Sequence, residues 1–244
     1  MTKVALVTGG ARRIGADIAR TLHARGLDVI IHCRHSRAEA DALAGELNAL
    51  RDNSAQVLVA DLLAPDDVRQ LAQDAMDIAG RIDVLVNNAS SFYPTPLADA
   101  TDDDWDALLH SNLRAPWLLI QSLAGSLREH HGSVINLVDV YAEKPLADHS
   151  LYCIAKAGLA MLTRSLAREL GPEVRINGVA PGPILWPEAG QDNQDEILAA
   201  TALKRAGTPA DIAGAVAFLA LDAGFTTGQI LAVDGGRSLG FAGG

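Results

Sequence analysis

Short aliphatic runs alternate with longer stretches of helical periodicity along this chain, and this alternation limits the folds open to it. The runs are rich in β-branched and aliphatic residues, as buried strands are. They are Val4–Val7, Val29–Ile31, Val57–Val59, Val84–Val86, Val134–Val138, Val174–Val179 and Ile230–Val233. Strands that are separated by helices form parallel sheets. The sequence therefore predicts an α/β fold, doubly wound and Rossmann-like, with a mainly parallel seven-stranded sheet and helices on both faces.

The order of these segments predicts a single domain that spans residues 1–244. No repeat, low-complexity tract or Pro/Gly/Ser linker interrupts it, and 244 residues with 49% hydrophobic composition suit one large core. One long segment, Pro181–Asp195, has no clear pattern, and we expect a lid over about residues 181–202.

Charge and composition restrict the partners of the chain. A net charge of −10 argues against a nucleic-acid surface, so a small molecule is the expected ligand. The start, Met-Thr-Lys, runs directly into the first aliphatic run without a signal peptide, and no stretch reaches membrane length, which predicts a cytoplasmic protein. Cys33 and Cys153 are too few for a disulfide framework and lack metal-ligand spacing, so no metal is expected.

The turn after the first run is rich in glycine and precedes a helical stretch. It reads Thr8-Gly-Gly-Ala-Arg-Arg-Ile-Gly15. Glycines there let the backbone approach a pyrophosphate, and the amino terminus of the next helix supplies free N–H groups and a positive dipole end. The turn therefore predicts a dinucleotide site, although glycines at a strand-to-helix turn can also be purely structural.

The end of the second run indicates which dinucleotide is bound. Where an acidic residue would receive a ribose hydroxyl, the chain reads Ile31-His-Cys-Arg-His-Ser-Arg37. Arg34, His35 and Ser36, with Arg12 or Arg13, can hold a 2′-phosphate through charge-assisted hydrogen bonds. No acidic residue in this stretch competes for the basic groups. The pattern predicts NADP rather than NAD, with a solvated basic turn as the alternative.

A tyrosine, a lysine and an aspartate form the candidate catalytic group. Tyr152 and Lys156 lie four residues apart in the helical stretch His149–Leu170 and therefore share a helix face. A nearby ammonium favours phenolate, so we expect Tyr152 to have a pKa well below its usual value and to act as a general acid. Asp139 follows the buried run Ser133–Val138 and is expected at the carboxyl edge of the sheet, where such folds bind ligands.

These motifs, with Asn87-Asn-Ala89, Asn112 and the Pro181-Gly182 turn, resemble the short-chain dehydrogenase/reductase family over essentially the whole chain. Most members have a serine at the position of Asp139. Asp139, Arg13 and the run Asn87-Asn-Ala-Ser-Ser-Phe-Tyr-Pro-Thr-Pro-Leu97 instead resemble the pteridine reductases, which include enzymes that make tetrahydropterins and reduce dihydrofolate.

The resemblance implies a role for each matching residue. Tyr152 is the proton donor, Lys156 binds the nicotinamide ribose, and Asp139 supports the proton relay. Asn112, in the helix Asp102–Leu127, is the structural and water-relay asparagine, and Asp61 lies near the adenine. The implied cofactor contacts are Gly9, Arg12, Arg13, Ile14, Gly15, Arg34, His35, Ser36, Asp61, Leu62, Asn88, Ala89, Ser90, Tyr152, Lys156, Pro181, Gly182 and Ile184. The implied substrate contacts are Ser90, Phe92, Asp139, Tyr152, Pro183 and Trp186, with Phe92 covering one face of a pterin. The resemblance also implies a homotetramer.

The resulting hypothesis is an NADPH-dependent pteridine reductase that transfers hydride to C=N bonds of pterins or dihydrofolate. Hydride addition to C=N leaves negative charge on nitrogen, which a positioned acid must protonate. An ionised carboxylate at position 139 would repel the oxyanion that forms from a ketone. An NADPH-dependent carbonyl reductase of the 3-oxoacyl type is the alternative, and a catalytically silent nucleotide-sensing protein is a further one.

Overall fold

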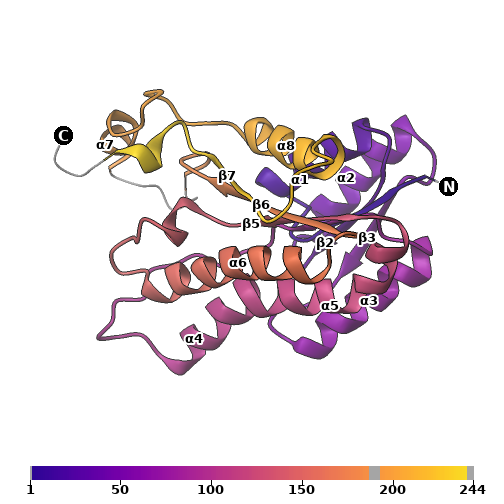
Figure 1. The fold of residues 1–244 in the computed structure, drawn as a ribbon, viewed down its shortest axis with the longest axis horizontal. Helices are drawn as coiled ribbons and strands as arrows, with labels where there is room; N and C mark the ends of the chain where they lie inside the picture. The colour runs from indigo at the N-terminus through magenta and orange to yellow at the C-terminus, as the bar shows by residue number, and fades with distance from the viewer. Residues whose placement is uncertain (1, 187–192, 241–244) are drawn as a thin grey trace.

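A single seven-stranded sheet forms the centre of the molecule (Figure 1). The structure is a computed structural model that describes residues 2–186 and 193–240. The strands are β1 (Val4–Val7), β2 (Asp28–Cys33), β3 (Ala55–Val59), β4 (Val84–Asn87), β5 (Ser133–Leu137), β6 (Arg175–Pro181) and β7 (Ile230–Val233). They pair in the order β3-β2-β1-β4-β5-β6-β7, and every pair is parallel. The predicted fold is confirmed, and the sheet is wholly rather than mainly parallel.

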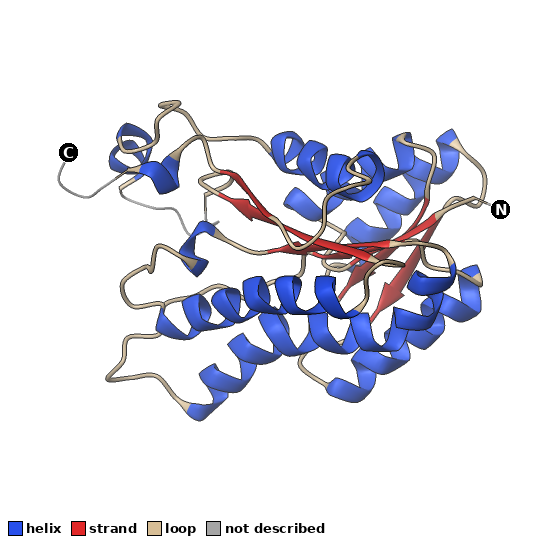
Figure 2. Cartoon of the chain, viewed as in Figure 1, coloured by secondary structure: helices blue, strands red, loops and turns tan. Residues whose placement is uncertain are grey.

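Helices cover both faces of the sheet (Figure 2). They are α1 (Arg13–Ala24), α2 (Arg37–Leu50), α3 (Pro65–Ala79), α4 (Asp102–Leu109), α5 (Ala115–Glu129), α6 (Ser150–Glu169), α7 (Gln194–Ala199) and α8 (Pro209–Ala217). Buried side chains of α1, α2 and α8 form one core with the sheet. Those of α3 and α5, with the end of α6, form a second core on the opposite face. The five inner strands, β1, β2, β4, β5 and β6, are covered on both sides, so their aliphatic runs are continuous rather than alternating. The edge strands β3 and β7 are partly exposed.

The candidate site lies where the strand order reverses. β1 pairs with β2 on one side and with β4 on the other, so the connections from β1 and from β4 diverge at their carboxyl ends. A crevice opens at such a switch point. Thr8 and Asn88 join its two sides, because the Asn88 amide donates to the Thr8 carbonyl at 2.8 Å.

The predicted helix Asp102–Leu127 differs from the observed one. α4 is followed by a π-helical segment, η1 (His110–Arg114), before the chain continues as α5 to Glu129. Asn112 lies in η1, fully buried, and its side-chain amide donates to the Leu108 carbonyl at 3.0 Å. A side chain that bonds the backbone in this way is one cause of such local widening of a helix.

None of the helices in residues 2–186 and 193–240 combines the length and apolar character that crossing a membrane requires. Residues 187–192, which form the middle of the predicted lid, lie outside the described residues. The part of the lid that is described consists of the segment up to Trp186, the helix α7 and the turn that follows it.

Candidate active site

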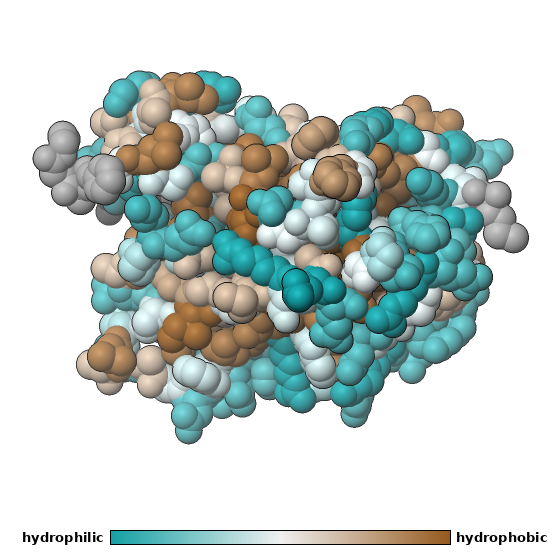
Figure 3. All heavy atoms as spheres, in the orientation of Figure 1, coloured by the Kyte–Doolittle hydropathy of each residue, from teal (hydrophilic) through white to brown (hydrophobic). Residues whose placement is uncertain are grey.

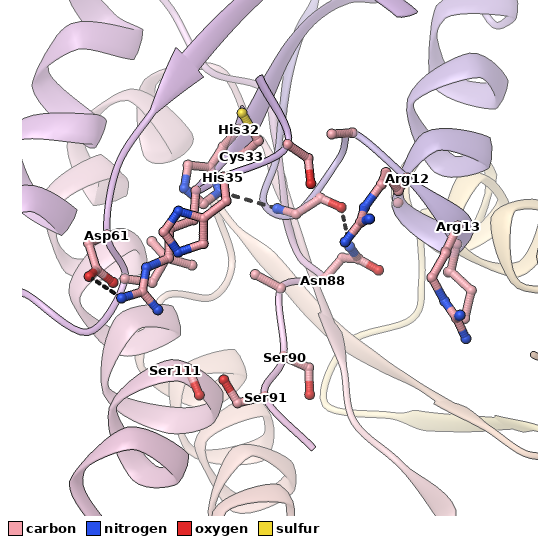
Figure 4. Close-up of a pocket in the computed structure, with 18 of the residues that line it drawn as sticks. Arg12, Arg13, His32, Cys33, His35, Asp61, Asn88, Ser90, Ser91 and Ser111 are labelled. Atoms are coloured by element: carbon pink, nitrogen blue, oxygen red, sulfur yellow. Dashed lines mark hydrogen bonds and ion pairs between the residues drawn. The ribbon is translucent and has the colours of Figure 1, made fainter. Parts of the chain in front are cut away.

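A cavity of about 430 Å³ occupies the crevice at the carboxyl ends of β1, β2, β3 and β4 (Figure 4). Most of the predicted cofactor contacts line it: Gly9, Arg12, Arg13, Ile14, Gly15, Arg34, His35, Ser36, Asp61, Leu62, Asn88, Ala89 and Ser90. The structure adds Ala11, His32, Cys33, Leu63, Ser91 and Ser111, which the sequence did not single out. The cavity does not include Tyr152, Lys156, Pro181, Gly182 or Ile184.

The turn after β1 packs so closely that Gly9 and Gly15 leave no room for side chains. A Cβ atom on Gly15 would lie 2.1 Å from the Gly9 carbonyl oxygen, and Gly9 itself has a φ of +59°. A side chain at Gly15 would therefore displace the turn. The turn packs tightly at the amino end of α1, where backbone N–H groups remain free to bind an anion.

His32 holds this turn against the neighbouring strand. Its Nδ1 accepts a hydrogen bond from the Gly9 N–H at 3.2 Å, and its Nε2 lies 3.2 Å from the Ala60 carbonyl oxygen. Because the Gly9 N–H can only donate, Nδ1 is unprotonated and Nε2 donates to Ala60. Burial lowers the pKa of His32, which favours this neutral form. A histidine within an apolar run is the sequence signal that could have indicated this contact.

The basic groups at the end of β2 have acidic partners, contrary to the prediction that none competes for them. Arg34 pairs with Asp61 at 2.7 Å, and Arg12 lies 3.8 Å from Glu39. Asp61 comes from the loop after β3 and was expected only beside adenine. Neighbouring strand ends meet at one edge of a parallel sheet, so a carboxylate distant in sequence reaches the arginine.

Arg13 connects the first turn with the segment after β6. Its guanidinium donates to the backbone carbonyls of Leu185 at 3.4 Å and Trp186 at 3.2 Å. The Ile184 side chain packs in the core beside α1 and α8, so only its backbone can face a cofactor. A Cβ on Gly182 would lie 2.6 Å from Asp234, which fixes this segment against the end of β7.

Asp139 and Tyr152 form a direct hydrogen bond, in which the Tyr152 hydroxyl donates to Asp139 Oδ2 at 2.7 Å. The other carboxylate oxygen accepts from the Tyr141 N–H at 2.9 Å. Asp139 follows β5 by two residues, as expected, and α6 brings Tyr152 to it from thirteen residues further on. Burial raises the pKa of Asp139, although these hydrogen bonds and Lys156 act in the opposite direction.

The predicted effect of Lys156 on Tyr152 is wrong in this structure. The pKa of Tyr152 is raised well above its usual value, first because the phenol is buried. In addition, the Asp139 carboxylate repels the phenolate form and accepts a hydrogen bond from the phenol form. Lys156 Nζ donates to the Leu137 carbonyl at 2.8 Å and lies 5.6 Å from the centre of the Tyr152 ring. Burial lowers the pKa of Lys156 to about 8.

Asn112 uses its side chain within the protein. Its Oδ1 accepts from the Ser90 hydroxyl at 2.7 Å, and its Nδ2 donates to the carbonyls of Ser91 and Leu108 at 2.9 and 3.0 Å. These bonds tie the loop after β4 to η1. Asn112 therefore positions Ser90 beside Tyr152, whose pKa responds to that hydroxyl.

Phe92 lies next to the acid pair, half exposed. Its ring stacks on His149 at a centroid distance of 4.8 Å and an angle of 18°, and it meets Tyr152 edge-on, also at 4.8 Å. One ring face is thus covered by imidazole, so a flat ligand would have to use the other face. His149 was not among the predicted contacts.

The parallel sheet, the glycine turn and the Tyr152–Lys156 pair define the class of protein. This chain belongs to the short-chain dehydrogenase/reductase family, whose members are oxidoreductases that bind NAD or NADP. A family profile described as enoyl-(acyl carrier protein) reductase matches residues 9–238.

Individual relatives span several activities. Pteridine reductase 1 of Leishmania tarentolae is 37% identical over 278 residues, covering 97% of this chain and 96% of that protein. The 3-oxoacyl-[acyl-carrier-protein] reductase of Synechocystis sp. is 36% identical over 238 residues, covering 96% of each. A blue fluorescent protein from a metagenomic library, solved in complex with NADPH, is 40% identical, with a TM-score of 0.91 and coverage of 96% of this chain and 97% of that one. Membership of the family is confirmed, and these identities do not separate the pteridine branch from the 3-oxoacyl reductases.

Proposed function

We propose that this protein is an NADPH-dependent pteridine reductase that transfers hydride to C=N bonds of pterins or dihydrofolate. One observation supports this substrate class above others: the acid that would protonate the substrate, Tyr152, is hydrogen-bonded to a second acid, Asp139, at 2.7 Å. Tyr152 can protonate the reduced nitrogen, and Asp139 is a second acid that can replace the proton of Tyr152.

The residues of the large cavity fit a dinucleotide with a 2′-phosphate. The close packing of Gly9 and Gly15 leaves the start of α1 open to a pyrophosphate. Arg34 and Arg12 line the cavity, and their partners Asp61 and Glu39 are each about a third to a half exposed. Such exposed ion pairs contribute about 0–1 kcal/mol, whereas a hydrogen bond to a phosphate is worth about 1.5–3 kcal/mol. A 2′-phosphate can therefore displace the carboxylates.

When bound, the cofactor supplies a hydride to the substrate. Tyr152 is protonated at neutral pH because its pKa is raised, and it can donate that proton to the nitrogen that becomes negative. A protonated Asp139, whose Oδ2 lies 2.7 Å from the Tyr152 oxygen, can then restore that proton. Lys156, held by the Leu137 carbonyl, places a cation near the ribose position, and Phe92 offers its free face to a flat heterocycle.

A carbonyl reductase of the 3-oxoacyl type is the second candidate, favoured by the Synechocystis relative at 36% identity. A protonated Asp139 beside Tyr152 could also serve a ketone, whose oxyanion an ionised carboxylate would repel.

A substrate panel tests the proposal. Purified protein with NADPH is assayed on dihydropterin, dihydrofolate, oxidised pterin and 3-oxoacyl thioesters, from about pH 4 to 8 to bracket a perturbed carboxylate. Pterin reduction is expected, and Phe92→Ala should weaken pterin binding by about 1–3 kcal/mol, the scale of aromatic stacking on a base. Brisk ketone reduction without pterin reduction would assign the chain to the carbonyl reductases.

The cofactor preference is tested separately at Arg34. Arg34→Asp removes a charged hydrogen bond worth about 1.5–3 kcal/mol, so the ratio of kcat/KM for NADPH over NADH should fall by about tenfold or more. A wild-type preference for NADH would show that these basic residues do not bind a 2′-phosphate.

We also propose a homotetramer. Exposed hydrophobic side chains on α4, α5 and α6 include Trp105, Trp117, Ile154 and Met161, each at least 40% exposed. Figure 3 shows hydrophobic atoms gathered over the region of α4 and α6. Such a patch is typical of a protein interface. Light scattering measures the number of subunits. Met161→Glu places a charge in the patch and should reduce that number.

A further inference from the structure

Three rings from a loop and a helix pack against one another beside the acid pair. Phe92 lies in the loop after β4, and His149 directly precedes α6, three residues before Tyr152. The imidazole covers one face of the Phe92 ring at an angle of 18°, and the Tyr152 ring stands at 74° to it. Phe92 is nevertheless 46% exposed, so part of its ring remains open to a ligand.

Hydrogen bonds within its own segment hold His149 in place. Its Nδ1 lies 2.7 Å from the Ala147 carbonyl oxygen, which can only accept, so Nδ1 carries the proton and donates this bond. The His149 carbonyl accepts from the Cys153 N–H at 2.9 Å, in the first turn of α6. The orientation of the imidazole is therefore set by contacts that do not involve Phe92.

A backbone hydrogen bond joins the two segments that carry the stacked rings. The Thr95 N–H donates to the Asp148 carbonyl at 2.6 Å, and Thr95 is buried. Asp148 has a φ of +57°, a left-handed conformation that aspartate tolerates better than most residues, and it immediately precedes His149. The loop after β4 is thus attached to the start of α6 at Thr95 and again, through stacking, at Phe92.

This packing ties the orientation of Phe92 to the helix that carries the proton donor. In the proposed function, a flat substrate on Phe92 must present a nitrogen to the Tyr152 hydroxyl while it receives a hydride, so the position of its plane relative to α6 matters. A half-exposed phenylalanine has other rotamers open to it. Stacking on a fixed imidazole favours one of them.

We propose that His149 is a positioning residue that controls substrate affinity through Phe92. The inference rests on the proposed function and deepens it, because it names the group that orients the ring beneath a flat substrate. Without the stack, the substrate is bound less well before and during the reaction, which raises KM and leaves kcat nearly unchanged. Neither Phe92 nor His149 lines the nucleotide cavity, so NADPH affinity should stay the same.

Two substitutions at His149 separate the effect of its ring from that of its hydrogen bond. His149→Phe keeps an aromatic ring against Phe92 but cannot donate to Ala147. His149→Asn removes the ring but keeps an N–H that can donate to Ala147, and asparagine suits the residue before a helix. Leu97→Ala is the control, because Leu97 lies in the same loop as Phe92 and is 89% exposed. Urea unfolding establishes that each variant is folded.

Each variant is measured for KM and kcat, and for the Kd of oxidised pterin with NADP bound. We expect KM and Kd to rise by about three- to tenfold in His149→Asn, the scale of one aromatic pair, with kcat within about twofold of wild type. His149→Phe should restore the wild-type values, and Leu97→Ala should keep them. In the Phe92→Ala background, His149→Asn should have no further effect.

Two results would overturn the proposal. The first is a His149→Phe variant that binds substrate no better than His149→Asn, because the ring would then not be what matters. The second is an additive effect of Phe92→Ala and His149→Asn, because His149 would then act independently of Phe92.

The wild-type protein on the substrate panel keeps this test apart from the test of the proposed function. If it reduces 3-oxoacyl thioesters and no pterin, the proposed function fails, and the same variants are measured with the thioester. Coupling between His149 and Phe92 on that substrate would keep the positioning role, and additive effects would overturn it too. Pterin reduction without coupling overturns the positioning role alone.

Discussion

Asp139 determines how the phenol of Tyr152 behaves. A carboxylate that accepts a 2.7 Å hydrogen bond from the phenol opposes its ionisation, and burial of both groups raises both pKa values. Tyr152 is therefore protonated at neutral pH until it gives its proton to the substrate, and the raised pKa of Asp139 favours the protonated form of that carboxyl group. The pair works as a coupled acid rather than as two independent groups.

The pH dependence of turnover should report Asp139. Because burial raises the pKa of Asp139, the protonated relay persists to higher pH than for an ordinary aspartate, and turnover should fall as pH rises through that raised value. Asp139→Asn removes the titrating group, so its slower turnover should lack this limb. Steady-state kcat measured across the pH range checks this. If kcat of Asp139→Asn falls with rising pH in the same way, the titration belongs to another group.

His32 offers a second test at the scale of one residue. His32→Leu leaves the Gly9 N–H without its acceptor, at a cost of about 1–3 kcal/mol for a buried polar group, so NADPH should bind about ten-fold or more weakly. His32→Gln keeps one acceptor and one donor and should retain most of the affinity. Fluorescence titration with NADPH measures both, and His131→Gln, at an exposed histidine that does not line the cavity, is the control. Equal affinities for the Leu and Gln variants would mean that His32 only fills space.

The elements follow from the sequence more closely than the contacts between them do. Each aliphatic run coincides with a strand to within two residues at either end, and the inner strands are the clearest because strands covered on both faces are continuously apolar. The π segment at Asn112 could not be predicted, because the hydrogen bonds of the Asn112 side chain include those to Ser90 and Ser91 in a distant loop. Likewise Asp61 meets Arg34, and His149 meets Phe92, only through the fold. The residue types of the site could be predicted from the sequence, but their contact partners could not.

The start of α1 provides a test at the scale of an element. Gly15→Ala would place its Cβ 2.1 Å from the Gly9 carbonyl, so the turn must shift, and NADPH binding should be largely lost. Gly45→Ala is the control, because a Cβ at this site in α2 meets nothing within 4 Å. That substitution should stabilise the protein by about 0.5–1 kcal/mol through helix propensity. Titration with NADPH and urea unfolding measure the two effects. Full NADPH affinity in Gly15→Ala would show that the turn tolerates a side chain.

At the scale of the whole molecule, the buried charge of Lys156 in the site lowers the free energy of unfolding. Lys156 is buried and donates a hydrogen bond to the Leu137 carbonyl, so its charge is stabilised less than in water. A lysine whose pKa falls to about 8 in the folded protein is easier to deprotonate there than in the unfolded chain, where the value is about 10.4. Such costs at functional positions are offset by packing elsewhere, here by the two cores on either face of the sheet.

Lys156→Met should therefore stabilise the protein while it abolishes turnover. Below about pH 8 the folded state holds a costly charge, so the gain in the free energy of unfolding should be largest there, on the order of 1–3 kcal/mol after the lost bond to Leu137 is subtracted. As pH rises from about 8 to about 10.4, the unfolded chain binds more protons than the folded one, so the wild type gains stability and the advantage of Lys156→Met should shrink. Urea unfolding at pH 7 and pH 10 measures this difference, with Lys144→Met as a control at an exposed lysine. An advantage of the same size at both pH values would show that the buried charge of Lys156 is not the source of the cost.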